Sequence, residues 1–287
     1  MATEGAQDRF EPLHDAHAIE QLVATIQFEQ PLSDEAIRAG IGAMASFQSK
    51  LKGFHDIRGV GFQFGPGGVI PMAQTQNAPA DGHVRFATDE AGVVLRELRL
   101  DRQSLVFRTQ AYTRWDAIWT EAQTYISEIL PVLGEASVSA FALHYIDKFL
   151  WTGRPDKCRP GPLFRPGSPY LAPRSLESDD LWHCHSGQFR TASPEAKRLE
   201  VVDIDCIDEA MHRPPSTLDT HRVVRISTVI TDRFNQPGYK PRKVDCKSAM
   251  GVASESFPAL HTELKRVFSE ILSDEYAVRV GMNANAG

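Results

Sequence analysis

Apolar and polar residues alternate in the first long apolar segment of the chain, residues 19–29. The apolar side chains would share one face of a strand, because successive strand residues point to opposite faces. Pro31 ends this pattern, and Ser33 then stands at a helix N-cap position before apolar residues at helical spacing. Residues 53–81 are rich in Gly, Pro, Gln and Asn and predict a long connection with a short strand near 60–64.

Three short apolar segments separated by turn residues predict an antiparallel meander over residues 84–109. Thr113 and Asp116 form a capping pattern, and an apolar stripe at helical spacing then continues to Leu133. Residues 137–151 are apolar on both faces, as in a strand covered on both sides. The predicted order is therefore β-α-β-β-β-α-β. With one hairpin strand left out, this is the order of a ferredoxin-like unit.

The second part of the chain predicts fewer and longer elements. Strand candidates lie at residues 181–190, 197–208 and 222–234, and a helix with a broad apolar face lies at 257–272. The intervening residues between the last strand and this helix are polar. The pattern therefore predicts a second antiparallel sheet packed against a C-terminal helix.

Six prolines within residues 152–178 separate the two parts and indicate a connection without regular structure. We therefore expect an α+β protein of two joined halves, residues 1–151 and 179–287. Each half would contain an antiparallel sheet backed by helices, and the first half would be ferredoxin-like.

Composition narrows the function only slightly. The chain of 287 residues has 31 Lys and Arg against 37 Asp and Glu, a net charge of −6. This charge argues against sequence-independent binding to nucleic acid. It has no apolar run of membrane-spanning length and no apolar leader, so we expect a cytoplasmic protein that does not enter a membrane. None of the four cysteines forms a C-x-x-C pair, which makes a zinc ribbon unlikely and fits reduced thiols. They are Cys158, Cys184, Cys206 and Cys246.

The string Trp-His-Cys-His places His183 and His185 on one face of a predicted strand. Two imidazoles at this spacing can bind a transition metal if a neighbouring strand supplies a third ligand, such as Asp205, His212 or His221. The simpler interpretation is a solvent-facing strand, since two histidines alone specify no metal.

Asp203, Asp205 and Asp208 follow in the next predicted strand, where the first two share a face. Paired carboxylates can hold Mg²⁺ or transfer protons. The alternative is the polar outer face of an amphipathic strand.

Polar residues also interrupt the apolar elements themselves. His144, Tyr145 and Asp147 lie in the apolar strand, and His261 lies on the apolar face of the last helix. A buried histidine needs a hydrogen-bond partner, so His261 fits a satisfied core residue. If His144 and His261 met between the two halves, they would line a pocket.

Basic residues on the predicted sheets, among them Arg225, leave an RNA-binding surface open, because ferredoxin-like sheets can bind RNA through aromatic and basic side chains. The sequence pattern of a classical RNA-recognition domain is absent. A solvated charged face is the simpler interpretation.

Three segments resemble a sporadically distributed bacterial family of unassigned function. They are a Tyr-x-x-Trp helix start at Tyr112 and Trp115, a strand Leu-His-Tyr-Ile-Asp at residues 143–147, and a C-terminal helix with Leu260 and His261. In the strand, His144 and Asp147 replace the Arg and Asn that the family carries. The resemblance implies a bacterial cytoplasmic protein, from a mobile or defence-associated gene neighbourhood. It implies no reaction.

Taken together, these patterns favour a non-catalytic binding or assembly component that contacts a protein partner or itself and uses no cofactor. The binding candidates are His144, Tyr145, Asp147, Arg225 and His261. Two alternatives stay open. One is an RNA-binding or RNA-processing protein, and the other is a metal-dependent enzyme that uses the two histidines of the Trp-His-Cys-His string with an aspartate.

Overall fold

The computed structural model gives the backbone over most of the chain. The residues that it describes are 8–58, 62–65, 68–71, 80–178, 180–213 and 217–282.

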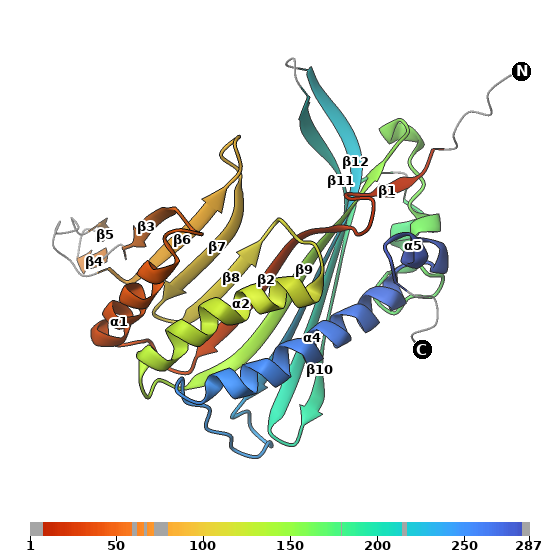
Figure 1. Ribbon diagram of the computed structural model, residues 1–287. Coiled ribbons are helices and arrows are strands. Elements are labelled where there is room, and N and C mark those ends of the chain that lie inside the picture. The colour runs from red at the N-terminus through yellow and green to blue at the C-terminus, as the bar shows by residue number, and fades with distance from the viewer. Residues whose placement is uncertain are drawn as a thin grey trace, which may run out of the picture.

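Ten of the described strands form one antiparallel sheet (Figure 1). In chain order they are β1 (Phe10–Pro12), β2 (Ile19–Phe28), β3 (Gly53–Ile57), β6 (Gly82–Thr88), β7 (Val94–Asp101), β8 (Ser104–Thr109), β9 (Val138–Trp151), β10 (Trp182–Ser193), β11 (Ala196–Arg213) and β12 (Thr217–Phe234). The order across the sheet is β10-β11-β12-β9-β2-β8-β7-β6-β3, and β1 pairs with the end of β9. Strands β4 (Phe62–Gly65) and β5 (Gly68–Pro71) form a separate two-stranded sheet.

Three longer helices, α1 (Asp34–Met44), α2 (Trp115–Ile129) and α4 (Ala249–Ile271), cover the same face of the large sheet (Figure 1). The described helices also include short ones: α3 (Pro173–Leu176), α5 (Asp274–Arg279), and the 3₁₀ turns η1 (Ala45–Phe47), η2 (Leu130–Leu133), η3 (Pro155–Lys157) and η4 (Gly161–Leu163). The main core lies between the long helices and the sheet, and residues of both the first and the last part of the chain fill it.

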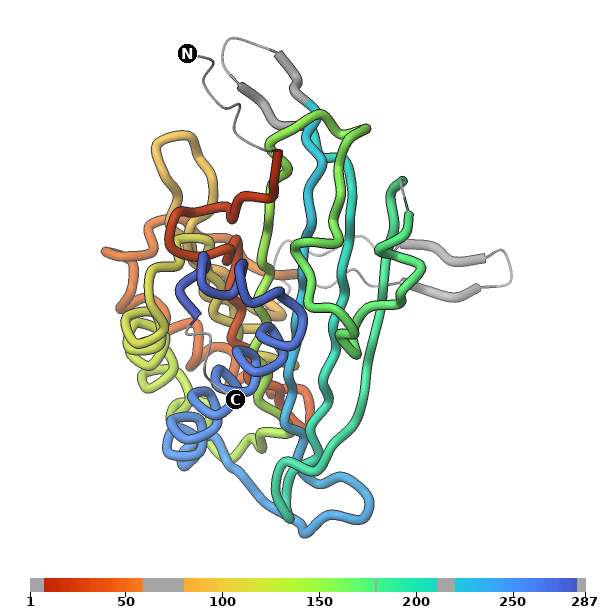
Figure 2. Tube along the Cα trace, turned by 90° about the vertical axis from the view of Figure 1, so that its right-hand side faces the viewer, coloured from red at the N-terminus to blue at the C-terminus, as the bar shows by residue number. Residues whose placement is uncertain are grey.

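The expected antiparallel sheet backed by helices is confirmed, but the expectation of one sheet in each half is wrong. Strand β9 pairs with β2 on one side and with β12 on the other, so hydrogen bonds run without a break across the two parts. The long strands β11 and β12 then continue the sheet beside β9 (Figure 2). The physical reason is visible in the sequence of β9: a strand that is apolar on both faces belongs in the middle of a sheet.

Local signals place some helix boundaries better than others. Ser33 caps α1 as expected, because its Oγ accepts a hydrogen bond from the Ala36 amide at 3.2 Å. The capping pattern expected at Thr113 is wrong, since the N-cap of α2 is Arg114 and no side chain caps it. Helix α4 begins eight residues before the expected start (257 − 249 = 8), because the small residues Ala249 and Ala253 pack there without exposure.

The connection in residues 53–81 contains more strand than expected, with β3 before the short strand predicted near residues 60–64. Residues 66 and 67 of the predicted Gly-Pro-Gly-Gly turn lie outside the described residues. No helix in the described part of the chain combines the length and the apolar character that crossing a bilayer requires.

Candidate functional site

A cavity of about 410 Å³ lies between the sheet and helices α2 and α4. We call its buried side chains from β9 and β12 the floor and the facing sides of the two helices the walls. The exposed lining residues, among them Ala16, Arg114, Asp116 and Lys265, form the mouth. This volume is within the range of small-molecule sites, which also favour the space between packed elements. The cavity joins residues from every part of the chain, so it exists only in the folded protein.

Two buried polar side chains form the floor of the cavity. Asp147 of β9 is 3% exposed and Thr228 of β12 is 2% exposed. Among the described residues, Asp147 has no hydrogen-bond or ion-pair partner, and the Thr228 Oγ1 is likewise unpartnered. Burial raises the pKa of the Asp147 carboxyl to about 8, because the charged form loses its hydration. Buried polar groups without partners are rare in folded proteins and point to a missing ligand or water.

The strand register explains why these groups share the floor. Tyr145 and Asp147 are two residues apart on β9, so both side chains point to the face covered by the helices. Thr228 lies directly opposite Tyr145 on the neighbouring strand β12. The three polar side chains therefore form one patch beneath α4.

His261 of α4 closes one wall of the cavity. Its Nδ1 and the Tyr145 hydroxyl form a hydrogen bond of 2.8 Å. Burial, and then the positive charge of Lys265, lowers the pKa of His261 to about 4, so the imidazole is neutral at pH 7. Burial also holds the pKa of Tyr145 well above its usual value, followed by the influence of Tyr112. The pair is therefore uncharged over the physiological range.

Aromatic rings fix the position of this wall. The Trp115 ring stacks on His261 with centroids 4.3 Å apart and planes 8° apart. Trp119, one turn along α2, stacks on Trp115 with centroids 5.8 Å apart and planes 3° apart. Tyr112 meets Tyr145 edge to face at 6.0 Å. Stacked rings of this kind contribute about 1 kcal/mol each beyond their buried area and hold the polar tips in place.

His17 approaches the cavity from the segment after β1. Its ring lies 5.2 Å from that of Tyr112, and its Nδ1 is buried without a partner among the described residues. Burial, and then His14, lowers the pKa of His17. Apart from Asp147, the Arg, Lys, Asp and Glu side chains of the lining are Arg114, Asp116 and Lys265, and all three are exposed at the mouth.

The structure brings together three of the five binding candidates. Tyr145, Asp147 and His261 line the cavity. His144 lies on the opposite face of β9, where its Nε2 is 2.9 Å from the Ser227 hydroxyl and burial lowers its pKa. His144 and His261 therefore do not meet. Neighbouring strand residues point to opposite faces, and His261 packs on the face that carries Tyr145.

Arg225, the fifth candidate, also lies on the face away from the cavity. Its guanidinium is 3.3 Å from Glu20 and 3.6 Å from Glu209. Both carboxylates also contact the buried ammonium of Lys148. Arg225 thus belongs to a compact ion-pair group that ties β2, β9, β11 and β12 together.

The histidines proposed as metal ligands are more than half exposed on β10. The Nδ1 of His183 is 2.5 Å from Asp205, and His185 contacts Asp203 in the same way one step along the ladder. In the described part of the chain, no group of three or more His, Cys, Asp or Glu side chains has an arrangement that could hold a metal ion.

Among the described residues, His221 does not complete this site. His221 lies four residues along β12 from Arg225, which is the register partner of Asp205 (225 − 221 = 4). The side chain of His212 lies outside the described residues. The exposed ladder is therefore a row of cross-strand pairs, as the simpler interpretation of the sequence expected.

Sequence reasoning missed several lining residues, above all Thr228, His17 and Lys265. Thr228 sits among alternating apolar residues of β12 and gives no local signal. The useful signal was Asp147, an acid on the side of β9 where Leu143, Phe149 and Trp151 are buried in the core. Because alternate strand residues share a face, the positions of these residues along β9 place Asp147 and Tyr145 on one face and His144 on the other.

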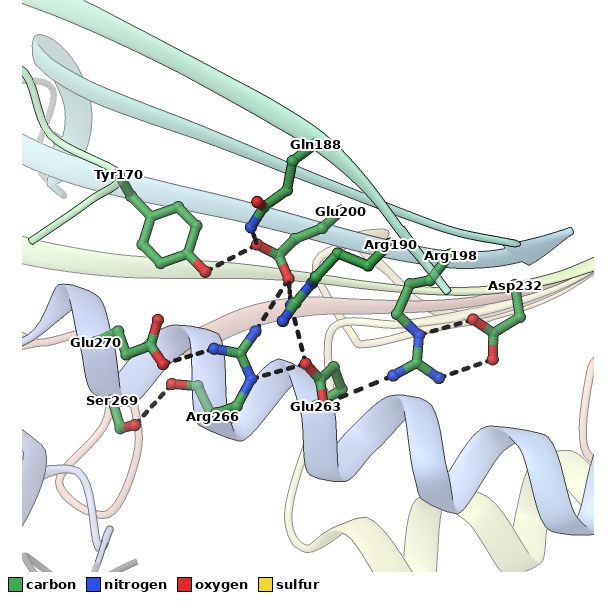
Figure 3. A network of polar contacts seen from close by, with 10 residues as sticks. All are labelled: Tyr170, Gln188, Arg190, Arg198, Glu200, Asp232, Glu263, Arg266, Ser269 and Glu270. Carbon is green, nitrogen blue, oxygen red and sulfur yellow. Dashed lines mark hydrogen bonds and ion pairs between the residues drawn. The ribbon is translucent and has the colours of Figure 1, made fainter. Parts of the chain in front are cut away.

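A second polar group lies farther out under the same helix, centred on Glu200 of β11 (Figure 3). Glu200 is 1% exposed and accepts hydrogen bonds from Tyr170 at 2.8 Å and from Gln188 at 2.6 Å. The guanidinium groups of Arg190 and Arg266 contact its other oxygen.

Glu263 and Glu270 of α4 extend the Glu200 network through Arg266, at 2.7 and 2.5 Å. Arg198 joins it to Asp232 in a two-pronged contact at 2.7 and 2.8 Å. Each charged group in this network has an opposite partner. The network therefore fixes α4 on the outer strands and leaves no open site.

In comparisons with known proteins, no family model matches the chain and no curated protein matches it. The family resemblance found in the sequence motifs thus stays an expectation.

Proposed function

We propose that the protein is a non-catalytic binding component that holds a small molecule in the cavity between α2, α4 and the sheet. The observation that carries the proposal is the unpartnered pair on the cavity floor, Asp147 and Thr228. An empty cavity is expected to be apolar, whereas a polar floor with unmet hydrogen-bond capacity needs a ligand or ordered water. A bound ligand would stabilise the folded protein by mass action.

The chemistry of the walls favours binding over catalysis. An effective general base has a pKa near the working pH, and the pKa of His261 is about 4. Tyr145 is held protonated by burial, and its hydroxyl is already engaged with His261. The rings therefore serve better as fixed walls than as groups that transfer protons.

The wider proposal follows the family resemblance. The protein would be a bacterial cytoplasmic protein that contacts a protein partner, or a second copy of itself, when its ligand is bound. In support of a ferredoxin-like first half, the order β9-β2-β8-β7 with α1 and α2 on one face is the order of such a unit, extended by β6 and β3. In support of a reducing compartment, all four cysteines are free. Placement near mobile or defence genes rests on the resemblance alone.

RNA binding is a weaker proposal. The sheet face away from the long helices carries Arg108 and Arg225, but each forms an ion pair with a nearby glutamate. Asp203 and Asp205 add negative charge to the same face. Phosphate contacts need an excess of free cations, so these pairs disfavour an RNA backbone there.

A fragment screen tests the binding proposal. We expect fluorine-labelled fragments to bind the wild-type protein, as observed by ¹⁹F NMR, and to lose binding in Ala16→Trp, because Ala16 is exposed at the cavity mouth and a Trp there fills it. The matched control is Ala117→Trp, an exposed position on α2 outside the cavity lining. If no fragment distinguishes Ala16→Trp from Ala117→Trp, the cavity is not a binding site.

A further inference from the structure

We propose that the cavity selects a small organic cation with N–H donors, such as an amine, an amidinium or a guanidinium, and that Asp147 is its counter-ion. This inference rests on the proposed binding function and names its ligand class. It depends on where the charged and uncharged groups of the cavity lie.

The floor offers acceptors to a ligand and no fixed cation. Asp147 is buried without a partner, and the unpartnered Thr228 Oγ1 lies on the same face of the adjacent strand. A carboxylate accepts hydrogen bonds at both oxygens, and a hydroxyl oxygen accepts at two positions. A cationic group with several N–H donors would satisfy both groups together. An anion would instead be repelled by the carboxylate of Asp147.

The walls suit the organic part of such a ligand. Tyr112 and Tyr145 present aromatic rings, and the faces of such rings attract cations as well as apolar groups. Phe268 of α4 and Ile19 add apolar surface to the lining. The cations of the cavity, Arg114 and Lys265, are exposed at the mouth, where solvent screens their repulsion.

Binding of a cation should release a proton from Asp147. With a pKa of about 8, this carboxyl is mainly protonated in the empty cavity at pH 7, and a bound cation favours its ionised form. The affinity for a permanent cation should therefore rise with pH until Asp147 is ionised without help. One released proton corresponds to about a tenfold rise in affinity per pH unit below that pKa.

The other groups that face Asp147 keep their charge state between pH 6.5 and 8. From the segment after β1 and from α4, His17 and His261 have lowered pKa values and stay neutral. From β9 and the segment before α2, the pKa values of Tyr145 and Tyr112 are raised by burial and both stay protonated.

At the mouth, the exposed charged groups are Arg114 and Asp116 around the start of α2 and Lys265 on α4. Exposed arginine, lysine and aspartate side chains in general do not change charge between pH 6.5 and 8. A pH dependence in this window therefore reports Asp147.

Three probes of the same shape and different charge test the proposal. They are the fluorinated benzamidinium cation, the neutral benzamide and the benzoate anion, each titrated by ¹⁹F NMR. At pH 8 we expect benzamidinium to bind wild-type protein about tenfold more tightly than benzamide. From pH 8 to pH 6.5 its affinity should fall about tenfold or more, while that of benzamide stays constant. Calorimetry in buffers of different ionisation enthalpy should show nearly one proton released at pH 7.

Two matched variants locate the charge. Asp147→Asn should bind benzamidinium and benzamide equally and without pH dependence. Glu128→Gln, which removes an exposed acid of α2 outside the cavity lining, should keep the preference of the wild type. If Asp147→Asn does not fold, proton release by the wild type decides the question alone.

The outcomes separate the inference from the proposed function. Equal binding of benzamide and benzamidinium, a preference for benzoate, or the loss of preference in Glu128→Gln would overturn the cationic ligand class while leaving the cavity as a binding site. Fragments that fail to distinguish the blocked variant Ala16→Trp from its control would overturn the binding function itself.

Discussion

Two polar regions lie beneath α4 on the same face of the sheet, and they differ in how their charges are satisfied. On one side of the helix, Glu200 receives hydrogen bonds from a tyrosine, a glutamine and two arginines. On the other side, the carboxyl of Asp147 is equally buried but has no partner among the described residues. The same helix contributes Glu263, Arg266 and Glu270 to the first region, and His261 and Lys265 to the second.

The opposite pKa shifts follow from this difference. Burial alone would raise the pKa of both carboxyls. For Glu200, hydrogen bonds from Gln188 and Tyr170 and the charge of Arg190 outweigh burial and lower the pKa. For Asp147, nothing opposes burial and the pKa is raised to about 8. A buried acid with its partners supplied by the fold has a structural role, whereas one without partners is available to a ligand.

Removal of Glu200 is expected to give the largest effect. Glu200→Ala removes the buried carboxylate that Arg190 and Arg266 share, and it leaves the Tyr170 hydroxyl without its acceptor. Because both arginines keep Glu263, we expect a cost of about 2–3 kcal/mol. We expect the free energy of unfolding, measured with urea at pH 7, to fall by this amount. The matched control is Glu195→Ala, whose exposed carboxylate pairs with Arg242 and should cost less than about 1 kcal/mol.

Equal losses in these two variants would show that the Glu200 network does not stabilise the fold. The pH dependence provides a second check. Because the folded pKa of Glu200 is lowered, its contribution is present above the ordinary glutamate pKa and is lost as the pH falls through the folded value. The difference between Glu200→Ala and the wild type should therefore shrink in acid.

The sequence predicted the strands and helices that carry these regions but not their arrangement into one sheet. Alternation in residues 19–29 and the helical spacing after Ser33 are local patterns, and both elements form where they were expected. The pairing of β9 with both β2 and β12 depends on contacts between distant residues. The sequence of β9 indicated burial on both faces, yet it did not reveal which strands would flank it.

The second prediction is that Asp147 destabilises the ligand-free protein as the pH rises. The folded protein keeps a proton on this carboxyl between its ordinary pKa of 3.8 and about 8, so stability is highest below this range and is lost as the pH rises through it. From pH 6.5 to 8, wild-type protein should lose about 1–2 kcal/mol of unfolding free energy. The unfolding free energy of the Asp147→Asn variant should change little over the same pH range.

The pH window was chosen because His261 acts in the opposite direction below it. The folded pKa of His261 is about 4, so its contribution to stability is present above the ordinary value of 6.5 and is lost as the pH falls toward 4. Above pH 6.5 the slope from this group fades, and it is nearly gone at pH 8. Asp116→Asn serves as the control and should keep the wild-type slope. A slope that persists in Asp147→Asn would assign it to another group.

The hydrogen bond between Tyr145 and His261 should have a smaller effect. Tyr145→Phe removes the hydroxyl from a 2.8 Å contact, and the loss of one neutral hydrogen bond costs about 1 kcal/mol. Urea unfolding at pH 7.5 measures it. Tyr239→Phe removes an exposed hydroxyl that contacts Thr191 and should change stability less. If the two changes cost the same, the wall of the cavity is not rigidly held.

The candidate site was predictable only in part. Tyr145, Asp147 and His261 stood out because polar groups on apolar faces are unusual, and the structure brings these three together. Two further lining groups, Thr228 and Lys265, are ordinary residues of an alternating strand and an amphipathic helix. Only the register of β12 against β9 and the placement of α4 give them a role. Local patterns thus identify unusual residues, while the tertiary fold determines which other residues lie next to them.

The smallest effect is expected on the exposed face, at the pair His183 and Asp205. The hydrogen bond that His183 donates to Asp205 raises the pKa of His183, so its contribution to stability is present below the ordinary value of 6.5 and is lost as the pH rises through the folded value. Solvent screens this pair, and His183→Ala should cost less than about 0.5 kcal/mol at pH 5.5 in low salt and nothing at pH 8. Unfolding at both pH values, with and without 0.5 M salt (roughly a Debye length of a few Å), measures it. A larger loss that persists in salt would mean that the row of His–Asp pairs on β10 and β11 is not a solvated surface. His183 and His185 would then again be candidate metal ligands, separate from the cavity of Asp147.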